Sequence, residues 1–282
     1  MRIIRVFVQR TSYTPDDDMV YIGSPPGGLF MPEHDEVHVS CTFSWDRPSA
    51  ERLAAEWAEA TDKPVRLGGP AYDSPAEDFT PGLYVRQGIT FASRGCNNAC
   101  PWCCVPRIEG QLREIPITPG NIIQDNNFLQ CSRSHKDKVF DMLRTQKSIC
   151  FKGGLESDLI DDHFVDAVRG LRIAELWLAC DTDAAFPAFR RAAQKLTAAG
   201  FTRHQLRCYS LIGHDMEAEE ERNREIWRLG VMPHSQLELD YSEAKTEYSP
   251  EWKAFQRLWQ RPALMYAHMR EIDNTTPTGR VP

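Results

Sequence analysis

Three cysteines are close together in the sequence, in a loop of small and polar residues. Cys96, Cys100 and Cys103 are spaced by four and three positions, so a single loop can direct three thiolates toward one face of an inorganic cluster. Three thiolates on a cubane 4Fe-4S cluster leave one iron without a protein ligand, and a second molecule can bind that iron. The spacing therefore favours an iron–sulfur centre with one open coordination position.

The cysteine loop resembles that of the radical SAM superfamily. The family pattern is Cys-x3-Cys-x2-Cys with an aromatic residue directly before the third cysteine, and Trp102 occupies that position here. The resemblance implies that S-adenosylmethionine (SAM) binds the open iron. It also implies that an electron from a reductase or flavodoxin-type donor cleaves SAM into methionine and a 5′-deoxyadenosyl radical. The cofactors then carry the reactive chemistry, and the protein positions and shields them.

Other uses of the cysteines agree less well with the sequence. Structural zinc usually binds two Cys-x2-4-Cys pairs some distance apart, and no second pair follows this loop. A disulfide framework conflicts with the odd total of nine cysteines and with the absence of a secretory signal. Cys104 adjoins a predicted ligand and is interpreted as a packed residue. The cysteines interpreted as buried small hydrophobic residues in or beside separate strands are Cys131, Cys150, Cys180 and Cys208.

The composition is that of a globular protein. The chain has 282 residues, of which 41% are hydrophobic and 26% charged, enough for one large core or for one core and a small lobe. No apolar run is long enough to span a bilayer, so we expect no membrane partner. We expect a reducing cytoplasm, which an oxygen-sensitive cluster also requires. The net charge of −7 argues against a broadly basic surface for nucleic acid, although a local patch is sufficient.

Residues 1–85 are predicted to form a small α/β lobe. Alternating apolar residues over 37–43 indicate a strand, a capped helix follows, and residues 65–70 form a second strand. Residues 14–35, rich in Pro, Gly and Asp, are expected to be loop. The Gly-Gly-Pro end of the lobe is similar to the cobalamin-binding lobe that precedes many radical SAM barrels. Its Asp-x-His-x-x-Gly loop is missing here, so we interpret the lobe as structural or as a substrate-shaping cap without cobalamin.

Residues 86–245 alternate between predicted strands and helices, which indicates an α/β fold with a partial (β/α)6 barrel. Residues 246–282 have helical spacing of aromatic residues and are expected to form a helical extension that packs on the barrel. The predicted helices cover 134–146, 161–171, 186–199 and 217–229. The predicted strands cover 89–93, 121–125, 149–151, 176–180, 206–212 and 237–239.

In βα barrels, functional residues collect at the carboxyl ends of the strands. Asp125, Asn126 and Asn127 follow the second predicted strand. The family often has Gly-Gly-Glu there to receive the SAM amino group, and carboxylate and amide oxygens accept the same N–H bonds. A turn with a helix cap is the alternative use of these side chains.

The third predicted strand leads into a run of glycines. Gly153 and Gly154 allow close backbone approach to a ligand, and Glu156 adds a carboxylate beside them. Lys152 could hold a carboxylate of SAM or of the substrate. Further predicted substrate contacts are Arg107, in a local group of basic residues, and Glu238, in the sixth strand.

The fourth and fifth predicted strands supply candidates for binding the adenosine part of SAM. Asp181 is placed to accept from ribose hydroxyls or, alternatively, to cap the next helix. Residues Leu211 to Gly213 resemble the family's hydrophobic run against which adenine packs. The acid that usually closes this motif is displaced, with Met216 in its place and Glu217 next to it.

Five segments between Arg94 and Gly213 together resemble one compact family of radical SAM proteins. They are Arg-Gly-Cys, Val-Pro-x-x-Glu-Gly, Asp-Asn-Asn-x-Leu, Gly-Gly-Leu-Glu and Cys-Tyr-x-Leu-Ile-Gly. The resemblance implies hydrogen-atom abstraction from the substrate. Our preferred substrate is a modified nucleobase in DNA or RNA, which is rearranged or modified further; a peptide or a small metabolite is the alternative.

Two further alternatives are disfavoured. Methylthiotransferases of tRNA share the first half of this signature. They also need three N-terminal cysteines for a second cluster and an RNA-binding barrel, and only Cys41 precedes the loop here. A non-catalytic iron–sulfur module would be expected to close all four irons, and a non-catalytic zinc module would be colourless.

Overall fold

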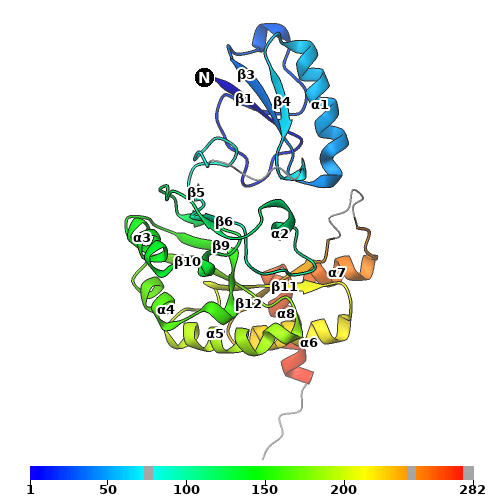
Figure 1. Cartoon of the computed structure of the whole chain (residues 1–282). Coiled ribbons are helices and arrows are strands. Elements are labelled where there is room, and N and C mark those ends of the chain that lie inside the picture. The colour runs from blue at the N-terminus through cyan, green and yellow to red at the C-terminus, as the bar shows by residue number, and fades with distance from the viewer. Residues whose placement is uncertain (73–78, 240–245, 276–282) are drawn as a thin grey trace, which may run out of the picture. The chain divides into compact units, whose positions relative to one another are not determined.

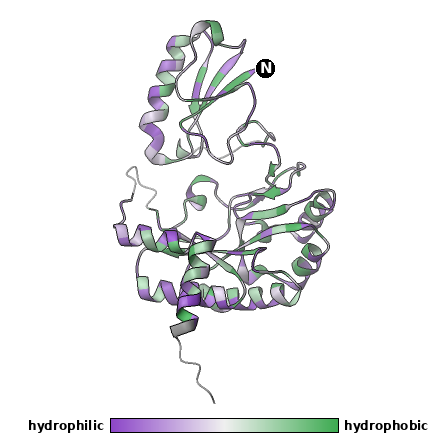
Figure 2. Cartoon of the chain, turned by 180° about the vertical axis from the view of Figure 1, so that it is seen from behind, coloured by the Kyte–Doolittle hydropathy of each residue, from purple (hydrophilic) through white to green (hydrophobic). Residues whose placement is uncertain are grey.

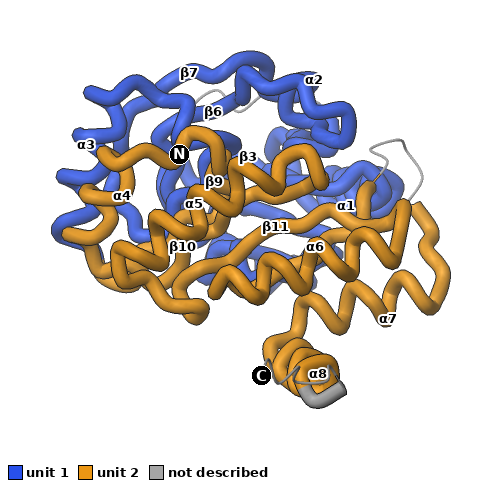
Figure 3. The backbone as a smooth tube through the Cα atoms, turned by 90° about the horizontal axis from the view of Figure 1, so that it is seen from below, with its two compact units in different colours: residues 1–146, 240–245 blue, residues 147–239, 246–282 orange. Residues whose placement is uncertain are grey.

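The computed structural model describes residues 1–72, 79–239 and 246–275 (Figure 1). The fold is α/β, as predicted. Its larger sheet has six strands in the order β12-β11-β10-β9-β8-β5, and a four-stranded sheet has the order β2-β1-β3-β4. The chain forms two compact units (Figure 3): residues 1–146 belong to unit 1, and residues 147–239 with those from 246 onward belong to unit 2. Closure of the larger sheet into a partial barrel stays a prediction.

The N-terminal part of unit 1 is a parallel sheet covered by one helix. The strands are β1 (Ile3–Phe7), β2 (Val20–Ile22), β3 (Glu36–Ser40) and β4 (Val65–Gly68), and the helix is α1 (Arg47–Ala60). Trp57 of α1 is fully buried and its indole N–H donates to the Gly23 carbonyl at 3.1 Å. Figure 2 shows both hydrophilic and hydrophobic residues along the helices, as expected for elements with one buried face.

The expectation that residues 14–35 form only loop was wrong. Val20 to Ile22 pair in parallel with Arg5 to Phe7 and form β2. The three-residue strand lies among Asp, Gly and Pro residues, so the local composition does not reveal it. Pairing with a buried neighbouring strand decides its conformation.

The rest of unit 1 consists of short elements around the cysteine loop. Strand β5 (Ile89–Thr90) pairs in parallel with β8 (Ile122–Ile123), whereas β6 (Ser93–Arg94) pairs antiparallel with β7 (Arg113–Glu114). The helices are α2 (Val105–Ile108) and α3 (Arg133–Leu143). The predicted strand 89–93 is therefore interrupted, because the Ala92 amide donates to the Asp125 carboxylate at 2.8 Å and not to a neighbouring strand.

Unit 2 contains four parallel strands: β9 (Ile149–Glu156), β10 (Ile173–Ala179), β11 (Leu206–Ile212) and β12 (Met232–Leu237). Helices α4 (Asp162–Arg169), α5 (Phe186–Ala198) and α6 (Met216–Arg228) connect them. Phe151 of β9 packs edge-on against Phe164 of α4, with ring centroids 5.9 Å apart. The alternation of strand and helix was predicted correctly for this unit.

Two strand positions in unit 2 were predicted wrongly. The third strand continues through Gly153 and Gly154 to Glu156, because Leu155 and Glu156 still pair with β10 beyond an irregularity in the register. The sixth strand covers 232–237 and not 237–239. Its sequence contains Pro233 and several polar residues, so it lacks a clear period, but all six residues pair with β11.

The C-terminal helices belong to the core of unit 2. Helices α7 (Pro250–Leu258) and α8 (Pro262–Thr275) bring Trp259, Met265 and Met269 into one buried cluster with Trp227 and Met232. The aromatic residues with helical spacing thus pack on α6 and β12. No helix among the described residues has the length and apolar character needed to cross a bilayer.

Candidate functional site

The cysteine loop lies in unit 1 between two paired strands. Cys96, Cys100 and Cys103 are all half-buried, and the loop turns where the Cys103 amide donates to the Cys100 carbonyl at 3.1 Å. Strands β6 and β7 pair directly before and after the loop and fix its two ends. Trp102 is half-buried beside the third cysteine, and Arg107 is exposed on α2.

A charged group joins the two ends of the loop. Glu109 lies 3.8 Å from the Arg94 guanidinium and 2.9 Å from that of Arg113. Arg94 also lies over the ring of Phe91, 3.6 Å from its centroid. Since Arg94 and Glu109 are only about a tenth to a sixth exposed, water screens this contact less than it would a surface ion pair.

Gly95 is required by the backbone of the loop. Its φ is +80°, and a Cβ atom there would lie 2.2 Å from the Gln111 carbonyl oxygen. A side chain at this position would clash with backbone atoms of Gly110 and Gln111, which cannot move aside as the end of a flexible side chain can. The glycine therefore permits the close approach of the two loop ends just before Cys96.

The segment after β8 holds the cysteine loop through its side chains. Asp125 accepts from the Ala92 amide at 2.8 Å and from the Ser93 hydroxyl at 2.6 Å. Asn126 accepts from the Gly95 amide at 3.0 Å. The sequence thus correctly identified residues that lie beside the loop, but Asp125 is 1% exposed and its carboxylate binds the protein itself. Contact of Asp125 to Asn127 with SAM stays a prediction.

Two further residues of this segment contact the loop itself. Asn127 donates to the Cys96 sulfur at 3.6 Å. Gln130, which no sequence pattern indicated, accepts from the Asn97 amide at 2.8 Å and donates to the Asn98 side chain at 3.1 Å. These contacts of Asn126, Asn127 and Gln130 thus hold residues 95–98, the first half of the loop.

The residues of the loop fit an iron–sulfur cluster in their chemistry. The Asn98 amide donates to the Cys96 sulfur at 3.4 Å, in addition to Asn127, and such N–H···S bonds stabilise thiolate ligands and set cluster potentials. Burial raises the pKa of the Cys103 thiol, and the neighbouring cysteines add to this effect. A metal cation opposes both effects, because it binds the thiolate form and therefore lowers the pKa of the thiol.

The loop does not present a ready site for a single metal ion. Among the described residues, no three His, Cys, Asp or Glu side chains converge closely enough to hold one. In a cubane cluster each thiolate binds a different iron, so its ligands are spaced more widely than those of one zinc ion. The two kinds of site therefore place different requirements on the spacing of the three sulfurs.

Unit 2 collects the remaining predicted residues at the carboxyl ends of its strands. Glu156 ends β9 opposite Ala179, Asp181 follows β10, and Gly213 follows β11. These residues share one edge formed by the parallel strands of unit 2, as the alternation predicted. Their contacts with SAM stay predictions.

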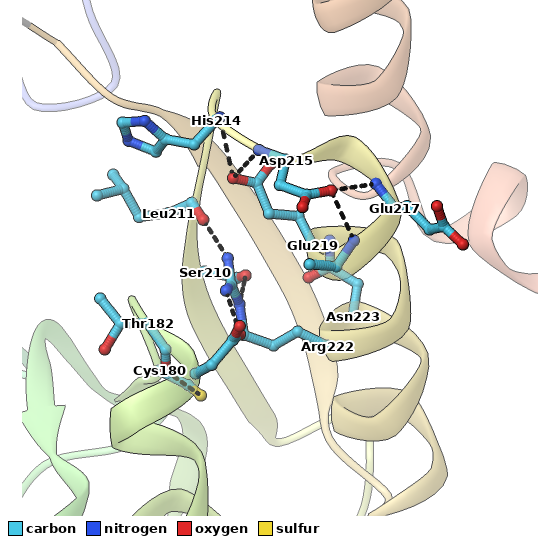
Figure 4. Close-up of polar contacts among 12 residues, drawn as sticks. Cys180, Thr182, Ser210, Leu211, His214, Asp215, Glu217, Glu219, Arg222 and Asn223 are labelled. Carbon is cyan, nitrogen blue, oxygen red and sulfur yellow. Dashed lines mark hydrogen bonds and ion pairs between the residues drawn. The ribbon is translucent and has the colours of Figure 1, made fainter.

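Glu219 is an acid beside Gly213 that the sequence analysis did not select. Its carboxylate is 4% exposed and accepts from the amides of Gly213, His214 and Asp215 at 3.0, 3.1 and 3.3 Å (Figure 4). Asp215 caps α6 by accepting from the amide of Glu217. An acid four positions after an N-cap was the available signal, because the first turn of a helix places such a side chain back over the preceding turn.

Arg222 was also missed. It is buried and donates to the Leu211 carbonyl, to the Ser210 hydroxyl at 3.3 Å, and to Asp183 at 2.6 Å (Figure 4). It thus connects the end of β11 with the segment after β10. The Leu211 carbonyl is engaged by this contact, while the Leu211 side chain stays half-buried.

The predicted substrate residues of unit 2 both have partners. Lys152 forms an ion pair with Glu175 at 3.3 Å and lies over the ring of Trp177, 5.6 Å from its centroid. Glu238 contacts the His214 ring at 2.5 Å, and its carbonyl accepts from the Tyr248 hydroxyl at 2.6 Å. Glu238 follows β12 and is not part of a strand.

No protein-family model matches the sequence, and no curated protein is significantly similar to it. The functional argument therefore depends on the residues of the loop and of the sheet.

We predict that Asp125 makes stability pH-dependent in a defined direction. Burial raises its pKa from 3.8 to about 6, against the opposing effects of the Ser93 hydroxyl and the Ala92 amide. The folded protein binds the proton of Asp125 more tightly than the unfolded chain does. The resulting contribution to the free energy of unfolding is fully present below pH 3.8 and is lost as the pH rises through about 6. Asp125→Asn removes the titrating group, so the variant should not lose stability as the pH rises. The side-chain oxygen of the asparagine can still accept from the Ala92 amide.

Thermal unfolding of wild type and Asp125→Asn between pH 4 and 7 tests this prediction. The melting temperature of the variant relative to wild type should rise across this range. Asp141→Asn, an exposed change on α3, serves as the control. A difference that is constant with pH would contradict the prediction.

We also predict that Glu219→Gln destabilises the protein by about 1–3 kcal/mol. Glutamine has one acceptor oxygen, and its NH2 group would face the Gly213 amide, which now donates to both carboxylate oxygens. Urea unfolding measures the effect, with exposed Glu217→Gln as the control. Equal stabilities of the two variants would refute the role of Glu219.

Proposed function

We propose that the protein is a radical SAM enzyme in which Cys96, Cys100 and Cys103 hold a 4Fe-4S cluster. The observation that carries the proposal is the construction of the loop. Three half-buried thiols lie between paired strands, and two N–H groups are directed at the Cys96 sulfur. When bound, the cluster and SAM supply reductive cleavage to a 5′-deoxyadenosyl radical that takes a hydrogen atom from the substrate.

The residues around the loop would act by position. Asp125 and Asn126 fix the backbone before Cys96, so the first thiol is oriented before any ligand arrives. Asn127 and the Asn98 amide would lower the energy of the thiolate form of Cys96 by donating to its sulfur. Such preorganisation supports cluster binding because less conformational freedom is lost when the ligand binds.

The proposed substrate is a modified nucleobase in DNA or RNA, and the electron would come from a reductase or flavodoxin-type partner. The family resemblance of the segments between Arg94 and Gly213 supports this choice. A peptide or small metabolite is the competing substrate, and turnover assays with nucleosides, oligonucleotides and peptides discriminate between them.

Alanine variants of the loop test the proposal. After anaerobic reconstitution with iron and sulfide, the wild-type protein should be brown and should release 5′-deoxyadenosine from SAM with dithionite. Cys96→Ala, Cys100→Ala and Cys103→Ala should each lose the cluster and reduce product to background. Cys104→Ala, a neighbouring half-buried cysteine, should retain both.

Two results would refute the proposed function. One is a colourless protein that binds zinc instead of iron. The other is a brown protein that produces no 5′-deoxyadenosine with SAM and dithionite.

A further inference from the structure

One face of the sheet in unit 2 carries charged and aromatic side chains where a core would carry apolar ones. Trp177 of β10 lies opposite Arg207 of β11, and Tyr209 lies opposite His234 of β12. Because side chains alternate along a strand, these residues share a face. The set is half-buried and consists of Lys152, Glu156, Glu175, Trp177, Arg207, Tyr209 and His234.

The opposite face of the same strands is an ordinary core. Phe151, Leu176, Leu178 and Cys208 are at most 1% exposed, and Phe151 contacts α4. The helices therefore cover the face that bears these residues. The polar and aromatic character of the other face is not explained by packing against them.

The aromatic rings on this face form one group. The Trp177 ring lies 4.7 Å from that of Tyr209 and 5.0 Å from that of His234, measured between centroids. The Tyr209 hydroxyl donates to the Lys152 carbonyl at 3.0 Å, which holds its ring in place. Fixed rings of this kind form a stacking surface with little loss of side-chain freedom on binding.

The charged groups on this face are two cations and two carboxylates, because Glu156 ends β9 opposite Ala179 and so shares the face with Lys152, Glu175 and Arg207. Glu175 lies 3.3 Å from the Lys152 ammonium and 3.8 Å from the Arg207 guanidinium, and the three side chains are 21–28% exposed. Burial, together with Arg207, lowers the pKa of His234, so its ring is neutral at pH 7. The Nε of Arg207 is buried and has no partner among the described residues, so this guanidinium lacks one acceptor.

We infer that this face binds a nucleotide of a nucleic-acid strand, with its base on Trp177 and Tyr209 and its phosphodiester at Lys152 and Arg207. This assignment rests on the proposed function and adds the residues that would bind the nucleic-acid substrate. Lys152 and Arg207 both lie close to Glu175, so one phosphodiester can contact both cations. Base stacking on aromatic side chains supplies affinity for any base.

Calorimetric titration of the full chain, without SAM or reductant, tests the inference. The probe is TpT, a dinucleoside monophosphate with one phosphodiester charge, and thymidine is the uncharged comparison. TpT should bind more tightly than thymidine. Trp177→Leu should weaken both, and Lys152→Met should weaken TpT about tenfold while leaving thymidine unchanged.

Glu175→Gln gives the decisive result. Removing the carboxylate frees both cations, so TpT should bind several-fold more tightly, an effect that misfolding cannot produce. Lys195→Met on α5, which breaks an ion pair with Asp162 of α4, should leave binding unchanged.

The inference is overturned if TpT does not bind, if it binds no better than thymidine, if Glu175→Gln does not strengthen it, or if SAM competes with it. Binding is measured without iron or SAM, so failure of the proposed function alone would leave these affinities intact.

Discussion

The buried carboxylate of Asp125 is the interaction on which the geometry of the cysteine loop depends. It joins the end of β8 to the backbone that enters the loop, through the Ala92 amide and the Ser93 hydroxyl. Removing a carboxylate from water is unfavourable, as its raised pKa shows. Two donors offset part of that cost, and the same bonds replace the strand pairing that the chain abandons at Ala92. The loop thus begins at a fixed position, four residues before its first cysteine.

Unit 2 uses the same device after β11. Glu219 is buried and gathers the amides of the turn that contains Gly213, while Gly213 has a φ of +133° and approaches the Tyr248 hydroxyl closely. In both units, a carboxylate from a later segment satisfies backbone donors that the strand ladder leaves unpaired. This explains how strand ends that carry polar and glycine residues remain ordered without regular secondary structure.

The sequence predicted the features that depend on local pattern. Cysteine spacing and the strand–helix alternation of unit 2 both follow from residues within a few positions of one another. Prediction failed where distant pairing decides: β2 forms because β1 is beside it, and β12 forms against β11 despite Pro233. Arg222 could not be recognised because its role depends on Leu211 and Asp183, which come from different strand ends. The position of Asp125 was predicted, but its burial was not, since nothing local distinguishes a carboxylate that binds ligand from one that binds backbone.

The two faces of the unit 2 sheet show how function can be separated from stability in one element. Strands β9 to β11 alternate between buried apolar residues toward the helices and charged or aromatic residues on the other side. A sheet that only needed stability would gain from apolar residues on both faces, because half-burying Glu175, Lys152 and Arg207 costs desolvation that their mutual attraction offsets only in part. Departures from the stable pattern concentrate at functional sites. The helix-covered face stabilises unit 2, so the charged face can keep partly hydrated groups that are available to a ligand.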